Sequence, residues 1–348
     1  MTPAVKWMKI FVSWCHILLV LQSHISNVTC RGLGPVDALL INEESSKSVS
    51  TPPEDGCWVF HHMVKSGGTT VRGLLRLFVK RNGVHRISYA NDEWMRGAQG
   101  TRSADEVFRT GQGIIDGGYV EALRLIENNR NCKWFTTFRH PVSRLVSAFY
   151  YCKYMHRRIC GRFGFDLDSL TLVTFAELWG NYGLRQYALG FISTEDVLAS
   201  PAAQSCGRCP GWYIVKRYLQ DLQQQTHNDT AEAASTDEHI LFTFLEPTLE
   251  IISSRYTVVG ILEDMDTTTR LLDSALGMNQ FNWTVENQKL GIKNQDAGHK
   301  DEEHAAIRAA SKDPAIIRFI SLDIVLYEFA LGVHEKQVEQ YGVEKNKQ

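Results

Sequence analysis

The sequence predicts an α/β protein in which a central parallel sheet is flanked by helices. Short apolar segments rich in β-forming residues are followed repeatedly by polar loops and amphipathic helices, and this alternation is typical of parallel sheets. The composition agrees, because 44% of the 348 residues are hydrophobic and 22% are charged. It excludes a disordered chain and a multi-span membrane protein. With 37 Lys+Arg, 39 Asp+Glu and a net charge of -2, the chain also lacks the basic excess typical of nucleic-acid binding.

The predicted strands and helices begin at residue 57. The run Cys57–His61 is short, apolar and rich in β-formers, which predicts a buried strand. A break at Lys65–Gly68 precedes an amphipathic helix over about 69–81. The other predicted strands are 113–115, 133–138 and 256–260, and the other predicted helices are about 119–128, 141–154, 265–276 and 315–340.

The N-terminal region predicts a targeting segment. Lys6 and Lys9 precede an apolar run of 12 residues, Ile10–Leu21. A membrane-spanning helix needs about 20 apolar residues, whereas a signal-peptide core needs about 7–15. We therefore expect residues 1–30 to be a signal peptide, cleaved near Val28–Cys30, or a short signal anchor. Either alternative places the rest of the chain in the lumen of the secretory pathway.

The remaining chain divides into three predicted parts. Residues 31–56 are polar and contain several Ser and Pro residues, so they are expected to form a stem or linker. Residues 57–340 are expected to form one folded domain, and 341–348 a C-terminal tail. Three N-glycosylation sequons fit a lumenal protein, at Asn27, Asn228 and Asn282.

The cysteines also fit an oxidising compartment. Of the eight, Cys15 lies in the apolar run, which leaves seven in the lumenal part. Close spacing makes Cys152 with Cys160, and Cys206 with Cys209, candidate disulfides. An odd cysteine is left over.

A glycine-rich loop lies between the first predicted strand and the first predicted helix. It consists of Lys65, Ser66, Gly67, Gly68, Thr69 and Thr70. Glycines allow backbone amides to close around a phosphate, and the helix N-terminus adds positive potential. The lysine precedes the glycines, unlike in the P-loop of nucleotide triphosphatases. The alternative is a glycine-rich turn with a surface lysine.

A second motif follows the predicted strand 133–138. Arg139 comes at the strand end, where open α/β sheets bind ligands, and arginine is suited to bidentate contact with phosphate. Ser147 lies two helical turns later and could face the same place. Arg144 could instead form a structural ion pair, and we expect the aromatic run Phe149–Tyr151 to be core.

Together these motifs resemble those of the Golgi carbohydrate sulfotransferases that use 3′-phosphoadenosine 5′-phosphosulfate (PAPS). The closer likeness is to the group containing heparan sulfate 2-O-sulfotransferase. The family loop H-x-P-K-T-G-G-T-S is matched by His62–Thr70, with valine in place of proline, and R-[DH]-P-x-x-R-x-x-S-x-Y-Y is matched by Arg139–Tyr151. Residues 258–263 and 322–330 also resemble the family, and the likeness spans 57–335.

The resemblance implies a P-loop-like sulfotransferase fold and a Golgi enzyme that transfers a sulfuryl group from PAPS to a carbohydrate hydroxyl without a metal. It implies that Lys65 contacts the 5′-phosphosulfate and stabilises the leaving phosphate. The 3′-phosphate is expected to bind Arg139 and Ser147. The rest of the 5′-phosphosulfate site is expected to be Ser66, Gly67, Gly68, Thr69 and Thr70.

The implied partner is a carbohydrate acceptor, with anionic polysaccharides among the candidates. A basic patch after the second motif could bind such an acceptor, at Arg157, Arg158 and Arg162. No nucleic-acid partner is expected. The membrane is a partner only through the N-terminal segment, where that segment is not cleaved.

The family's general base is missing. Many relatives carry a histidine in a Gly-His element upstream of the second motif, but Gly113–Tyr119 contains none. Asp116 is the predicted substitute, with His85 and His62 as alternatives. Asp116 could equally be a helix N-cap.

Two other functions remain open. The missing histidine is compatible with a catalytically inactive, sulfotransferase-like protein that binds a glycan or nucleotide. The spacing of Cys206 and Cys209 is also found in thiol oxidoreductases, although a structural disulfide would give the same pattern.

Overall fold

The computed structural model describes the larger part of residues 57–344. These residues all lie within one compact unit of the chain, Lys47–Gln348. The described residues are 57–88, 113–119, 122–123, 132–155, 168–188, 190–192, 199–201, 216–218, 241, 243–278, 281–290 and 300–344. The predicted signal segment and stem lie outside them. Within the described ranges, no helix has both the length and the apolar character needed to cross a membrane.

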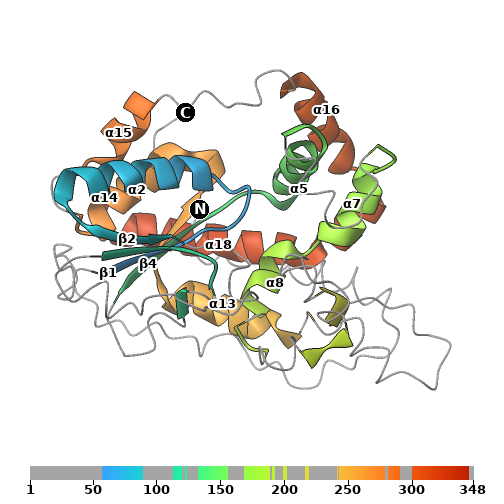
Figure 1. Cartoon of the computed structure of the whole chain (residues 1–348), viewed down its shortest axis with the longest axis horizontal. Coiled ribbons are helices and arrows are strands. Elements are labelled where there is room, and N and C mark those ends of the chain that lie inside the picture. Colours follow the sequence, from blue (N-terminus) through green and yellow to red (C-terminus); the bar gives the residue numbers. More distant parts are fainter. Residues whose placement is uncertain are drawn as a thin grey trace, which may run out of the picture. The chain divides into compact units, whose positions relative to one another are not determined.

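Five parallel strands form one sheet in the order β2-β3-β1-β4-β5 (Figure 1). The strands are β1 Cys57–His61, β2 His85–Ser88, β3 Gly113–Gly117, β4 Lys133–Phe138 and β5 Tyr256–Ile261. The predicted parallel sheet is therefore confirmed, with four of its strands at the expected places. The edge strand β2 was not predicted, because its four residues contain no apolar run.

Helices cover both faces of the sheet, as Figure 1 shows. One face carries α2 (Gly68–Asn82), α14 (Met265–Ala275) and α15 (Trp283–Leu290), and the other carries α8 (Tyr182–Ala188), α13 (Leu245–Ser254) and α18 (Ser321–Gln340). Side chains of a strand alternate between the two faces. In β1, Trp58 and Phe60 accordingly pack with the first set of helices, whereas Val59 packs with the second.

A third apolar cluster lies between helices alone. It joins α5 (Pro141–Tyr150), α7 (Leu172–Trp179), α16 (Lys300–Ala310) and α17 (Pro314–Phe319). The predicted helix 141–154 ends as a π-helix, Tyr151–Met155. The predicted helix 315–340 is two helices, α17 and α18, separated at Ile320. Most of the predicted helix 119–128 lies outside the described residues.

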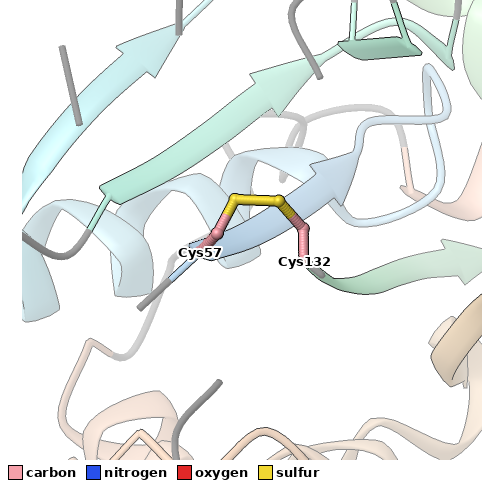
Figure 2. The surroundings of a disulfide bond; sticks show 2 residues. All are labelled: Cys57 and Cys132. Carbon is pink, nitrogen blue, oxygen red and sulfur yellow. A yellow bond between two sulfur atoms is a disulfide. The ribbon is translucent and has the colours of Figure 1, made fainter. Parts of the chain in front are cut away.

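A disulfide joins Cys57, at the start of β1, to Cys132, which precedes β4 (Figure 2). The two cysteines are 75 residues apart in the sequence, so spacing did not suggest the pair. The parallel register opposes Trp58 to Lys133 and thereby brings the preceding residues together. Cys152 is also disulfide-bonded. Cys160, Cys206 and Cys209 lie outside the described residues.

Candidate anion-binding site

The two sequence motifs meet at the carboxyl ends of β1 and β4. The chain runs from β1 toward β2 on one side and from β4 toward β5 on the other, so the strand order reverses between them. Open parallel sheets bind ligands at such a reversal. The Thr137 hydroxyl donates a 2.6 Å hydrogen bond to the Ser66 carbonyl oxygen, and Arg139 Nη1 lies 3.4 Å from the Lys65 carbonyl oxygen. Residues 74 positions apart thus form one site.

The loop after β1 has a constrained backbone. Lys65 has φ 64° and Gly67 has φ 81°, both in the left-handed region. A non-glycine residue is uncommon there, and such residues concentrate at functional sites. A Cβ on Gly67 would also lie 2.7 Å from Leu262 Cδ1. Gly67 is therefore required both by its dihedral angles and by the close approach of Leu262.

The loop ends at the N-terminus of α2, where the backbone favours an anion. The first helical hydrogen bond runs from Val71 N to the Gly67 carbonyl, so the amides of Gly68, Thr69 and Thr70 precede it. No described side chain caps this end, and no acidic residue lies in the first turn. The helix dipole and the amides therefore present positive potential.

His62 lies against the same helix turn. A Cβ on Gly68 would be 1.9 Å from both Cδ2 and Nε2 of His62, so the imidazole occupies the space that a side chain would fill. His62 N also donates to the Gly117 carbonyl at 2.8 Å, which fixes the start of the loop to β3. Gly68 therefore admits the ring of His62 to the candidate site.

Two cationic side chains flank the loop. Lys65 Nζ lies 4.3 Å from the centre of the Tyr151 ring. Arg139 Nη2 lies 3.5 Å from Glu303 Oε1. Tyr151 was expected in the core and instead lies beside Lys65, whereas Phe149 is in the core as predicted. The site therefore gathers two cations and a helix N-terminus.

Ser66 and Ser147 are less accessible than the cations. Ser66 is fully buried and anchors the loop through its carbonyl oxygen. Ser147 is buried in α5, so its contact with a 3′-phosphate stays a prediction. Arg144 forms a buried ion pair with Asp323 of α18, and this agrees with the structural interpretation of Arg144.

Asp116 is held between two arginines. It is fully buried within β3, Oδ1 lies 2.9 Å from Arg72 Nε, and Oδ2 pairs with Arg86. The alternative of a helix N-cap is wrong, because β3 continues through Gly117. These pairs tie α2 and β2 to β3. The role of Asp116 as the general base stays a prediction. It requires that the acceptor hydroxyl come within hydrogen-bonding distance of the Asp116 carboxylate.

A carboxylate that sequence reasoning missed supports the β4 loop. Glu263 Oε1 accepts from the His140 amide at 2.9 Å, and Oε2 accepts from the Tyr327 hydroxyl at 3.2 Å. Burial and the neighbouring Glu263 raise the pKa of Tyr327, which keeps this hydroxyl a donor. Glu263 comes two residues after the end of β5, the strand next to β4 in the sheet. Its signals in the sequence were this position and its place in the stretch 258–263 that resembles the family.

Neither a protein-family model nor a curated protein matches the chain. Within the part of the chain that the structure describes, no group of three or more His, Cys, Asp or Glu residues could hold a metal ion. The predicted basic patch lies outside that part, at Arg157, Arg158 and Arg162.

Proposed function

We propose that this chain transfers a sulfuryl group from PAPS to a carbohydrate hydroxyl in the lumen of the secretory pathway, and that the compartment is the Golgi. The observation that carries the proposal is the meeting of Arg139 with the Lys65 loop at the reversal of strand order. A donor with a 3′-phosphate and a 5′-phosphosulfate needs two separate anion-binding elements. This sheet edge offers both. The P-loop-like sulfotransferase fold is part of the same proposal.

The residues present fit the donor. The amides of the loop, together with the amides and the threonine hydroxyls of the first turn of α2, would hold the 5′-phosphosulfate. Lys65 would lie beside the bridging oxygen and stabilise the negative charge that develops on the leaving phosphate. Arg139 would pair with the 3′-phosphate, with Ser147 as the predicted second contact. PAPS supplies an activated sulfuryl group, so the protein's contribution is positioning and charge stabilisation.

A general base would take the proton as the acceptor hydroxyl oxygen bonds to sulfur and the sulfur–oxygen bond to the 5′-phosphate breaks. Asp116 was the predicted base, yet both of its oxygens are buried against arginines. His62 is the alternative whose ring lies at the first turn of α2. Since a base must reach the hydroxyl proton, the geometry favours His62 for this role.

Calorimetric titration of adenosine 3′,5′-bisphosphate into the full chain tests the proposal. We expect binding that Arg139→Ala weakens by at least about tenfold, because the change removes a charge-assisted pair with the 3′-phosphate. Arg76→Ala is the matched control, since Arg76 is exposed on α2. Absence of binding by the folded protein, or an equal loss in both variants, would overturn the proposal.

The base is tested by transfer of labelled sulfate from PAPS to desulfated heparin or chondroitin. We expect His62→Asn to lower the rate per folded molecule by about 10²–10⁴-fold. Asp116→Asn should instead lower the free energy of unfolding by about 3 kcal/mol, because it removes the buried carboxylate charge that pairs with the partly exposed Arg72 and Arg86. A loss of rate in Asp116→Asn with unchanged stability would assign the base to Asp116.

A second candidate is a catalytically inactive protein of the same fold that binds a nucleotide or glycan. The enclosure of Asp116 favours it, because the predicted base is then committed to holding α2 and β2. This alternative predicts that the wild-type protein binds adenosine 3′,5′-bisphosphate but transfers no sulfate to any acceptor, and that His62→Asn and Asp116→Asn transfer none either.

A further inference from the structure

Glu303 places a carboxylate beside Arg139, the cation of the second motif. It lies in the first turn of α16, and its carboxylate is 3.5 Å from the guanidinium of Arg139. The side chains are about four-fifths covered, with relative exposures of 15% for Glu303 and 20% for Arg139. The preceding residues Asp301 and Glu302 are exposed. Of the three acidic residues in this turn, Glu303 therefore points at the candidate phosphate site.

The packing of α16 explains this direction. Ala306, Ile307 and Ala310 pack against the apolar cluster of α5, α7 and α17. Glu303 precedes them by three, four and seven residues, so it lies on the same stripe of the helix. Figure 1 shows α16 beside α5, the helix that starts just after Arg139. The apolar contacts of α16 thus hold the Glu303 carboxylate toward Arg139.

We propose that Glu303 is a placeholder anion that pairs with Arg139 until a phosphate replaces it. This inference rests on the proposed function, because it takes Arg139 to be the residue that binds the 3′-phosphate. The pair keeps the guanidinium charge compensated and oriented while the site lacks a ligand. An incoming phosphate must displace the carboxylate, since the two anions would repel each other at one guanidinium.

The placeholder has a consequence for ligand selectivity. A nucleotide with a 3′-phosphate breaks the Arg139–Glu303 pair but forms a stronger, bidentate pair between its phosphate and the Arg139 guanidinium. Adenosine 5′-phosphate lacks the group that reaches Arg139, so it leaves the pair intact and gains nothing there. Glu303 therefore weakens the binding of 3′-phosphorylated nucleotides in particular, and removing its charge should strengthen that binding alone.

The test compares two ligands in calorimetric titrations of the full chain and its variants. We expect Glu303→Gln to tighten adenosine 3′,5′-bisphosphate by about fivefold, the equivalent of about 1 kcal/mol. The affinity for adenosine 5′-phosphate should stay unchanged. Glu302→Gln, which removes an exposed charge from the same helix turn, controls for the general change in net charge and should alter neither affinity by more than about twofold.

The outcomes separate this inference from the proposed function. If the wild-type protein binds adenosine 3′,5′-bisphosphate and Arg139→Ala loses it, the proposed site stands. Glu303→Gln with equal or weaker affinity then overturns the placeholder and makes Glu303 a residue that merely positions Arg139. An equal gain in affinity for both ligands overturns the placeholder as well, because the substitution would then act through the net charge of the protein and not through Arg139. If the folded wild-type protein binds neither ligand, the proposed function fails first.

Discussion

The hydroxyl of Thr137 donates a 2.6 Å hydrogen bond to the carbonyl oxygen of Ser66. This bond connects β4 directly to the loop that carries Lys65 and Gly67, both with left-handed backbone. The preceding residue in β4, Thr136, donates a 2.9 Å hydrogen bond to the carbonyl of His61, the last residue of β1. Adjacent threonines of one strand thus support two different features, namely the loop and the sheet.

The two threonines give a matched pair of variants. Thr137→Val and Thr136→Val each remove one buried hydrogen bond at nearly constant volume, and each should lower the free energy of unfolding by about 1–2 kcal/mol in urea titrations. Only Thr137→Val should weaken binding of adenosine 3′,5′-bisphosphate, by about three- to tenfold, because only that variant releases the loop. Equal affinities of the two variants would show that Thr137 does not support the site.

The sequence predicted those features that depend on local pattern. The strand Cys57–His61 followed from an uninterrupted apolar run. The resemblance to sulfotransferases implied that Arg139 and the Lys65 loop contact one donor molecule, and the structure places the two side by side. Glu303 could not be predicted, because it reaches Arg139 across 164 residues of sequence through the packing of α16. Tyr151 was misplaced because the aromatic run 149–151 was interpreted as one core segment, whereas Tyr151 is the first residue of the π-helix and its ring lies beside Lys65 Nζ.

His61 gives the folded protein a pH dependence. It is buried among Tyr119, Tyr187 and Tyr256, and its Nδ1 lies 2.7 Å from the Tyr256 hydroxyl. Burial lowers the pKa of His61 from 6.5 to about 3. Below pH 6.5 the unfolded chain therefore binds a proton that the folded protein does not, so the free energy of unfolding falls as the pH falls.

We expect this residue to remove about 2 kcal/mol of stability between pH 7 and pH 5. Denaturant titrations at several pH values measure the effect. His61→Asn should lose this part of the pH dependence, whatever its stability at pH 7. His304→Asn, at an exposed position in α16, should retain it. Parallel pH profiles for the wild type and His61→Asn would show that His61 is not the source.

The Cys57–Cys132 disulfide should stabilise the fold without affecting the site. Closing a loop across 75 residues reduces the entropy of the unfolded chain, which corresponds to about 4 kcal/mol in the loop-closure account. The double variant Cys57→Ala/Cys132→Ala should therefore melt about 10 °C lower. A double substitution is preferable to a reducing agent, since Cys152 is also disulfide-bonded.

The disulfide lies at the opposite end of the sheet from the candidate site, so ligand binding serves as the control for the double variant. It joins the amino end of β1 to the residue before β4, whereas the candidate site lies at the carboxyl ends of the same strands. At 25 °C the double variant should bind adenosine 3′,5′-bisphosphate within about twofold of the wild type, a difference of about 0.4 kcal/mol. A much larger loss of affinity with an intact fold would mean that removing the disulfide changes the spacing of β1 and β4 and thereby displaces the loops at their carboxyl ends.

Asn282 tests the proposed lumenal location. Its side chain is exposed, and Oδ1 accepts from the Val285 amide at 2.8 Å at the start of α15. The cap uses the oxygen, while an N-linked glycan is carried by the amide nitrogen, so both can exist together. We expect protein made in secretory cells to carry a glycan at Asn282, detected by peptide mass spectrometry before and after glycosidase treatment.

Two variants separate the glycan from the cap. Asn282→Asp removes the glycan but keeps a capping oxygen, so its free energy of unfolding should differ from that of enzymatically deglycosylated protein by less than about 0.5 kcal/mol. Thr284→Ser keeps the sequon and a hydroxyl in the place where Thr284 Oγ1 lies 3.1 Å from Asp273 Oδ2, and it should remain glycosylated. Because an exposed sequon in the lumen meets the glycosylation machinery during synthesis, an unmodified Asn282 in wild-type protein made in secretory cells would contradict the proposed lumenal location.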